Sequence, residues 1–288
     1  MHSILILTFY SFIVSFVAYV VSATIKKQFS HYIGLGFFFV ALVLNSIVVY
    51  NRWIEAGHAP FSNLYESLVF FAWSIAIVFF LMEVVTRAIR YDTGGRLRVI
   101  GAIQSLLACA MIAYAAFGAD DTIRPLMPAL QSAWMSIHVT VYFLGYAALS
   151  ISFASGIVYL VNRAINKQTV KDKDDKSVSY DKLGYIAVSI GFPFLTAGII
   201  TGAVWAKGAW GTYWSWDPKE TWSLITWLFY LVYLHLPFAI PHLNIKKTTW
   251  PILFSLVLII AFPTVLFTYV GLKYLPSASD SEHIYGSE

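Results

Sequence analysis

The sequence predicts an all-α polytopic membrane protein, a bundle of about eight transmembrane helices with both termini extracytoplasmic. Composition is the first reason, because 59% of the 288 residues are hydrophobic and 12% are charged. A soluble domain carries about 25% charged residues, so the composition excludes that class. The second reason is that the apolar residues form long continuous runs. The third is the uneven distribution of Lys and Arg between those runs.

Eight apolar runs follow one another along the chain. Each has roughly the 20 residues that a helix needs to cross a hydrocarbon core of about 30 Å. Because lipid offers no partners to backbone polar groups, runs of this length are helices rather than strands. The expected spans are about Ile4–Ile25, Tyr32–Tyr50, Leu68–Thr86, Val99–Phe117, Ala133–Val161, Leu183–Val204, Thr221–Ile240 and Pro251–Leu272.

The first run ends in small residues, as a signal peptide does. A signal peptide also has a basic segment before its apolar run, whereas Lys26 and Lys27 come after this one. We therefore interpret the run as a retained helix that enters from the outside. Little chain is left over for a soluble domain, so we expect residues 1–288 to form a single transmembrane domain.

Orientation follows from the basic residues. With the N-terminus outside, the inner segments hold fourteen of them: Lys26, Lys27, Arg87, Arg90, Arg96, Arg98, Arg163, Lys167, Lys171, Lys173, Lys176, Lys182, Lys246 and Lys247. The outer segments hold five: Arg52, Arg124, Lys207, Lys219 and Lys273. The positive-inside rule thus places both termini outside and makes residues 166–182 a cytoplasmic polar loop. The basic excess reports topology, and we expect no nucleic-acid partner.

Cysteine is almost absent from the chain. Cys109 stands alone in the middle of the fourth expected span. A single thiol cannot pass a disulfide across a membrane, because thiol–disulfide exchange needs a pair. Transmembrane thiol carriers are therefore excluded.

A segment rich in tryptophan lies on the predicted outer side. Residues 210–222, WGTYWSWDPKETW, hold four of the ten Trp residues of the chain. An aromatic belt at the membrane surface would spread its rings over many helix ends. Here the indoles gather within eighteen residues, at Trp205, Trp210, Trp214, Trp216 and Trp222. We expect residues 205–222 to form an external loop with a ligand.

The chemistry of this loop suits a large planar ligand with acidic edges. Indoles offer flat apolar area together with N–H donors, and Lys207 or Lys219 can meet the acids. Asp217, Pro218 and Glu220 also form a helix start, with an Asp cap, Pro at the first position and Glu three residues later. Asp217 is thus either a helix cap alone or part of the site as well.

Three of the seven histidines fall on the outer side with this loop, namely His58, His138 and His283. His31 and His242 fall in inner loops and His2 is terminal, so we treat these three as incidental. His138 stands about one helical turn above the hydrocarbon. It is either a polar anchor near a helix end or a metal ligand.

His235 lies at a different depth. It follows Thr221 by some 14 residues, which places it about 21 Å into the membrane, in the inner half. Ionisable groups at that depth are rare and often functional. The alternative is a neutral imidazole that donates to a backbone carbonyl of a neighbouring helix. His235 and His138 could not hold one iron together, so the pattern predicts two sites along a passage.

Four segments of the chain together resemble the CcsA/ResC type of cytochrome c biogenesis protein of the system II route, whose mark is a tryptophan-rich WWD motif. They are WAKGAWGTYWSWDPKETW, YLVYLH, SIHVTVYFLGYAAL and GHAPFSNLYESL. The resemblance runs from about residue 50 to the end of the chain. It implies transport of haem from the cytoplasmic side to the outer face, and its presentation to apocytochrome c for ligation at Cys-X-X-Cys-His.

The resemblance also implies roles for individual residues. Haem b would rest on a platform of Trp205, Trp210, Trp214, Trp216 and Asp217. The axial ligands of the haem iron would be His138 and His283, and His235 would take up haem nearer the inside. The family's second outer histidine usually stands in an HSYG-like context soon after the last span. Here it is EHIYG after a polar insertion, which leaves His58 as a substitute for His283.

The implied partners are a CcsB/ResB-type membrane protein, apocytochrome c and proteins of a thiol-reducing pathway. The implied enzyme is a cytochrome c synthase, or haem lyase, complex of which this chain is one part. The membrane would be a bacterial plasma membrane or a thylakoid membrane, with the haem site on the extracytoplasmic face. Three alternatives stay open: a small-solute transporter with His235 as proton relay, a system I-type haem handling protein, and a non-catalytic assembly scaffold. No pair of broken spans in matching halves favours a transporter.

Overall fold

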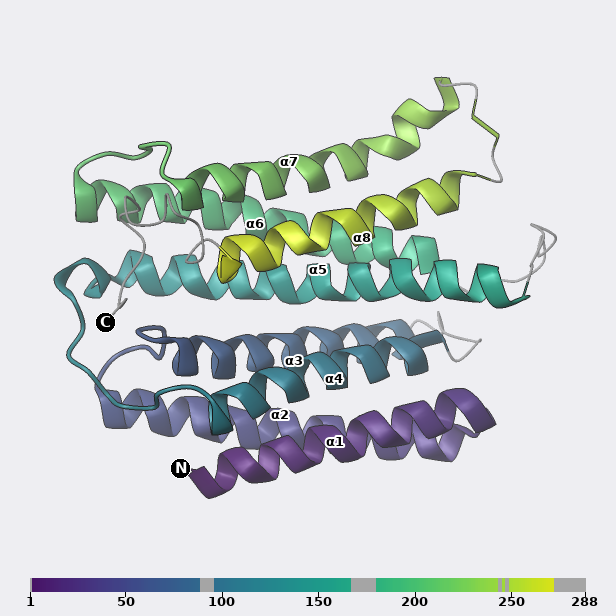
Figure 1. Ribbon diagram of the computed structural model, residues 1–288, viewed down its shortest axis with the longest axis horizontal. Helices are drawn as coiled ribbons and strands as arrows, with labels where there is room; N and C mark the ends of the chain where they lie inside the picture. The colour runs from purple at the N-terminus through teal and green to yellow at the C-terminus, as the bar shows by residue number, and fades with distance from the viewer. Residues whose placement is uncertain (1, 89–95, 167–179, 243–244, 247–248, 272–288) are drawn as a thin grey trace. The chain divides into compact units, whose positions relative to one another are not determined.

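The computed structural model describes residues 2–88, 96–166, 180–242, 245–246 and 249–271, and the regular structure within these residues is entirely helical (Figure 1). The elements are α1 (His2–Ile25), α2 (Gln28–Ala56), α3 (Leu64–Ala88), α4 (Arg96–Phe117), η1 (Pro128–Leu130), α5 (Ala133–Asn166), α6 (Tyr180–Trp210), α7 (Pro218–Ala239), η2 (Ile240–His242) and α8 (Trp250–Tyr269). In the described part of the chain, eight helices are long and apolar enough to cross a membrane. The predicted all-α membrane class is confirmed. The side on which the termini lie stays a prediction.

The helices form two compact units, which we describe separately. Unit 1 contains α1 to α4, and unit 2 contains η1 and α5 to α8. In unit 1, α1 packs against α2 and α4, and α3 packs against the same two helices. In unit 2, α5 packs against α6 and α8, and α7 packs against α6 and α8. Each unit is therefore a four-helix bundle.

Small residues let the helices of unit 1 approach closely. The Ser15 hydroxyl donates to the Gly34 carbonyl at 2.9 Å. The ring of Tyr19 lies over Gly34 and Gly101, where an added Cβ would stand 3.0 and 2.7 Å from the ring. Inside lipid such contacts between small residues, with hydrogen bonds across helices, replace the hydrophobic effect as the cause of helix association.

Unit 2 uses the same device between its two longest helices. Gly145 of α5 and Gly191 of α6 face each other, and a Cβ on either one would meet the other's carbonyl oxygen at 3.3 or 3.1 Å. The close approach brings α5 and α6 together along much of their length. Pro193 lies inside α6, which is tolerated in a membrane helix because neighbouring groups satisfy the freed backbone carbonyl.

The candidate site lies at one end of unit 2. In Figure 1 the N-terminal end of α5 and the loop between α6 and α7 lie at the same end of this unit. Helix α6 continues to Trp210, past its expected end at Val204, so Trp205 and Trp210 belong to its last turns. Gly211 follows with φ +87, the left-handed conformation that ends a helix.

Candidate functional site

His138 is held by a hydrogen bond that determines its tautomer. Its Nδ1 lies 2.8 Å from the carbonyl oxygen of Gly198, on α6. A carbonyl oxygen only accepts hydrogen bonds, so Nδ1 of a neutral imidazole must carry the proton, and Nε2 then has the lone pair. A histidine that binds a metal commonly donates its other ring N–H to a carbonyl or carboxylate in this way.

Glycine on α6 makes room for the imidazole. A Cβ built on Gly202 would stand 2.5 Å from Cε1 and 2.6 Å from Nδ1 of His138. A Cβ on Gly198 would stand 2.6 Å from the ring of Tyr142, and that ring packs edge-on against the imidazole with centroids 4.9 Å apart. Since no other residue lacks a Cβ, the face of α6 at Gly198 and Gly202 is shaped to receive these two rings.

Trp205 covers the imidazole from another side. Its ring is nearly parallel to that of His138, with 22° between the planes and centroids 6.0 Å apart. The side chain is 3% exposed, and its indole N–H donates to the carbonyl of Ala129, in η1, at 2.8 Å. Trp210 packs edge-on against Trp205 with centroids 5.3 Å apart. The structure thus brings His138 and the tryptophan-rich segment together, as the sequence predicts.

The two tryptophans of the loop itself are more open. Trp214 is half-buried, and it meets Trp216 at 90° with centroids 5.7 Å apart. Trp216 is 68% exposed, and its φ of +62 puts a bulky residue in the left-handed region. A non-glycine residue in that conformation is strained by about 1–3 kcal/mol, and such strain gathers at functional sites.

Asp217 and Glu220 form the predicted helix start of α7. An oxygen of Asp217 accepts from the backbone N–H of Lys219 at 2.8 Å, and Glu220 accepts from the backbone N–H of Asp217 at 3.2 Å. The two together make a capping box with Pro218 at the first turn. Glu220 also accepts from the backbone N–H of Ser215 at 2.7 Å. These bonds tie the end of the tryptophan loop to the helix.

The two lysines singled out from the sequence differ in position. The ammonium of Lys207 donates to the Gly211 carbonyl at 2.7 Å and lies 5.6 Å from the centroid of the exposed Tyr213 ring. It therefore stays at the rim of the loop. Lys219 is half-buried on the first turn of α7, beside the cap.

His235 stands on the last turns of α7, and its side chain is exposed. Nδ1 lies 2.7 Å from the carbonyl oxygen of Leu231, one turn earlier in the same helix, so Nε2 has the lone pair. Val232 and Phe238 beside it are 56% and 70% exposed. About 17 residues separate His235 from Pro218, which is about 26 Å along the helix. The depth of His235 in the membrane, relative to the His138 site, stays a prediction.

The remaining predicted ligands lie elsewhere. His283 is outside the described residues. His58 belongs to unit 1, in the loop after α2, and is half-buried. Its Nδ1 lies 3.1 Å from the Ala59 carbonyl oxygen, and its Nε2 is buried with no hydrogen-bond partner among the described residues.

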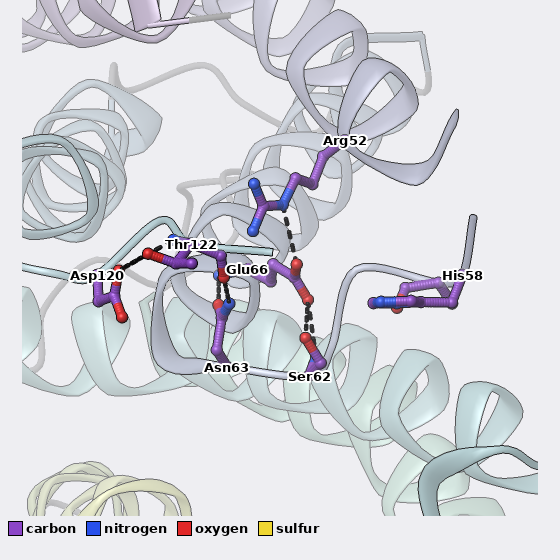
Figure 2. A network of polar contacts seen from close by, with 8 residues as sticks. Arg52, His58, Ser62, Asn63, Glu66, Asp120 and Thr122 are labelled. Atoms are coloured by element: carbon purple, nitrogen blue, oxygen red, sulfur yellow. Dashed lines mark hydrogen bonds and ion pairs between the residues drawn. The ribbon is translucent and has the colours of Figure 1, made fainter. Parts of the chain in front are cut away.

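A polar network joins the last turns of α2 to the start of α3, and Figure 2 shows it together with His58. The Nε–H of Arg52 donates to Glu66 at 2.9 Å, and the two side chains are 4% and 0% exposed. The Ser62 backbone N–H and hydroxyl donate to the other carboxylate oxygen at 2.8 and 2.7 Å. Nearby, hydrogen bonds from the hydroxyl and backbone N–H of Thr122 lower the pKa of the exposed Asp120 carboxyl.

A second buried pair was missed from the sequence. His31, which we set aside as a loop residue, lies inside α2 and is 2% exposed. Its Nε2 lies 2.6 Å from Oε1 of Glu83, on α3, and the Tyr19 hydroxyl donates to Oε2 at 2.8 Å. The signal was Glu83 itself, an acid inside the third expected span. An acid in a membrane helix is expected to have a polar partner.

The chain is similar to known proteins over most of its length. The family model described as Cytochrome C assembly protein matches residues 61–278. The cytochrome c biogenesis protein CcsA of Guillardia theta is 38% identical over 252 residues, covering 80% of this chain and 81% of that protein. CcsA of Chlamydomonas reinhardtii is 38% identical over 253 residues, covering 86% of this chain and 66% of that protein. CcsA of Synechococcus elongatus is 36% identical over 251 residues, covering 70% and 74%.

A solved structure shares the fold. The chain named Cytochrome c Heme Lyase CcmF superposes with a TM-score of 0.67 at 16% sequence identity, covering 96% of this chain and 47% of that chain. At that identity the likeness concerns the fold alone. The helical fold found for the described residues is therefore also found in part of a longer protein.

Proposed function

Because the chain belongs to the cytochrome c assembly protein family, we propose that it carries haem across the membrane and presents it for attachment to apocytochrome c. The observation that supports this most directly is His138, with its Nδ1 on the Gly198 carbonyl and its ring beside Trp205. An imidazole nitrogen with a defined lone pair therefore lies beside a group of indoles at one end of unit 2.

The residues present fit a haem. An imidazole with protonated Nδ1 offers Nε2 to iron, and the space for that imidazole exists because Gly202 has no Cβ. The exposed rings of Trp216 and Tyr213 give flat apolar area for a porphyrin face. Lys207 at the rim suits the haem carboxylates. The cargo is haem b, which has the vinyl groups still to be joined to protein.

The chain's own part in the reaction is to hold and orient. His138 binds the iron from one side, and the loop of Trp214 and Trp216 supports the porphyrin. When bound, the haem supplies the vinyl groups to which the cysteine thiols of apocytochrome c add. A nucleophile from this chain is unnecessary, since the substrate brings its own thiols. Axial ligands, hydrogen bonds and burial then adjust the electronics of the iron.

The second outer ligand is assigned to His283, with His58 as the substitute. We place this site on the extracytoplasmic face of a bacterial plasma membrane or thylakoid membrane, on the strength of the basic residues of the inner segments. Thiol-reducing pathway proteins would keep the apocytochrome cysteines reduced for the reaction.

His235 supports a second, inner site that a partner completes. An imidazole exposed among Val232 and Phe238 would face lipid if the chain were alone, and a polar group in lipid is costly. A CcsB/ResB-type membrane protein that covers α7 would remove this cost and enclose the haem on its way outward. The cytochrome c synthase is then the complex of the two proteins.

The test replaces His138 with alanine in the full chain, purified with and without a CcsB/ResB-type partner. Haem retained on purification should fall, holocytochrome formation should stop, and added imidazole should restore part of both. His242→Ala is a matched control, because His242 lies in η2 away from the loop. Normal haem content and normal maturation in the His138 variant would refute the assignment.

His235 is tested in the same preparations. His235→Leu keeps the apolar character of the α7 face and should leave the folded yield of the isolated chain unchanged. In the complex with the partner it should lower the amount of haem that reaches the outer site. Equal haem content of the wild-type and variant complexes would exclude the inner site.

A further inference from the structure

The tryptophans of the candidate site fall into two groups with different surroundings. Trp205 is 3% exposed, and its N–H is used by the Ala129 carbonyl. Trp216 is 68% exposed and meets Trp214 edge-on. A porphyrin can rest on an open indole, whereas the buried indole of Trp205, beside η1 and the His138 imidazole, has no exposed face to offer.

Trp205 instead contacts the imidazole on which the iron would depend. The two rings lie 22° from parallel with centroids 6.0 Å apart, within the range of offset-stacked aromatic pairs. Because the indole N–H is fixed to Ala129, the ring cannot rotate without losing that bond. The stack therefore fixes the plane of the imidazole in the direction that the hydrogen bond alone leaves free.

Three further residues surround the imidazole of His138. The Gly198 carbonyl fixes Nδ1, Tyr142 packs edge-on with centroids 4.9 Å apart, and Gly202 provides the space. A single hydrogen bond leaves an imidazole free to swing about it. Three neighbours, on α5 and α6, remove that freedom.

We propose that Trp205 is a positioning residue, which acts on haem through His138 by holding the plane of the imidazole, whereas Trp214 and Trp216 keep the porphyrin contact given in the proposed function. The inference rests on the proposed function for its biological meaning. Its physical content concerns the apoprotein alone.

The first test needs no haem. The full chain, purified in detergent without haem, is treated with diethyl pyrocarbonate, and modification of His138 is followed by peptide mass spectrometry. Trp205→Leu should raise the rate at His138 by about twofold to tenfold, the range that a lost aromatic pair corresponds to. Trp205→Phe, which keeps a ring but no N–H, should give a smaller increase. Trp216→Leu should leave the rate unchanged.

Trp227→Leu is the matched control for general loosening of unit 2. The Trp227 indole also donates across helices, to the Thr196 hydroxyl at 2.9 Å, and its ring contacts that of Phe192 of α6 at a tilt of 30°. If Trp227→Leu raises the His138 rate as much as Trp205→Leu does, Trp205 is only structural. An unchanged rate in both Trp205 variants overturns the proposal as well, whether or not the protein binds haem.

The second test uses the protein loaded with haem. Trp205→Phe should shift the electron paramagnetic resonance g-values of the ferric form, which depend on the planes of the axial ligands, at nearly normal haem content. Trp216→Leu should lower the haem content and leave the g-values in place. The reverse pattern would make Trp205 part of the platform and refute the proposal. Absence of haem in every preparation, with the His138 rates as expected, would refute the proposed function alone.

Discussion

Unit 1 and unit 2 differ in the partners of their polar groups. In unit 1 the buried groups are ionisable side chains that contact one another, Arg52 with Glu66 and His31 with Glu83, and these side chains are between 0% and 4% exposed. At the site in unit 2 the half-buried imidazole of His138 and the buried indole N–H of Trp205 are each bonded to a backbone carbonyl, and the buried acids Asp217 and Glu220 accept from backbone N–H groups. Beside them an indole of the loop stands 68% exposed.

The difference indicates that the polar groups of the two units have different roles. A buried ion pair seldom adds net stability, yet removal of one partner leaves a charge without compensation, so the pair restricts the packing to one arrangement. A neutral imidazole with a defined lone pair beside exposed rings does not restrict the packing in this way. It is suited to bind a ligand. We therefore expect substitutions in unit 1 to lower stability and substitutions at the unit 2 site to lower haem binding.

The largest effect is expected for Glu66→Ala. The variant leaves the buried guanidinium of Arg52 without its carboxylate, and loss of one partner of a buried pair should lower the unfolding free energy by about 3–5 kcal/mol. The melting temperature in detergent, followed by circular dichroism, measures this. Glu55→Ala, at an exposed site one turn along α2, is the control and should change little. A Glu66 variant as stable as the control would contradict the structural role of the pair.

Gly202→Ala comes next, and it probes unit 2. The added Cβ would stand 2.5 Å from His138 Cε1, so the imidazole must move, and overpacking of this kind costs about 1–3 kcal/mol. Retained haem should fall, while the helix content in circular dichroism stays the same. Gly208→Ala on the same helix has open space around its Cβ and should keep its haem. Equal haem in both variants would mean that the position of His138 does not matter.

How much of this was accessible from the sequence can be judged by particular residues. The start of α7 at Asp217 and Pro218 was predicted, because cap chemistry is local and can be read from four neighbouring residues. The meeting of His138 with the tryptophan-rich segment was predicted from a shared side of the membrane. The roles of Gly198 and Gly202 were not, because a glycine that receives a ring from another helix has no local signature.

The buried pairs show the same limit. Glu83 was visible as an acid in an apolar run, but its partner His31 lies 52 positions earlier in the chain. Tertiary packing decides which residues meet across that separation. The expected span Tyr32–Tyr50 also began too late, because α2 starts at Gln28, and this placed His31 in a loop. An error of one helical turn at a boundary was enough to hide the pair.

Asp217→Ala should have a smaller effect, and it separates the two readings of this residue. Loss of an Asp cap costs about 1 kcal/mol, so the melting temperature should fall slightly. If the cap is the whole role, Asp217→Ser restores stability and both variants keep the absorbance spectrum of bound haem. If Asp217 also meets the ligand, the serine variant recovers stability without recovering haem.

Trp216→Gly should change stability least. Glycine adopts φ of +62 without strain and so removes a cost of about 1–3 kcal/mol, while its greater freedom in the unfolded chain takes back about 0.4–1 kcal/mol. The exposed ring has little packing to lose, so the melting temperature should stay the same or rise slightly. Retained haem should nevertheless fall, because the open face of the platform is gone. Stability and binding would then move in opposite directions at one residue, which no purely structural role for Trp216 explains. A variant that loses stability and keeps its haem would instead show that Trp216 has a structural role, as the buried residues of unit 1 have.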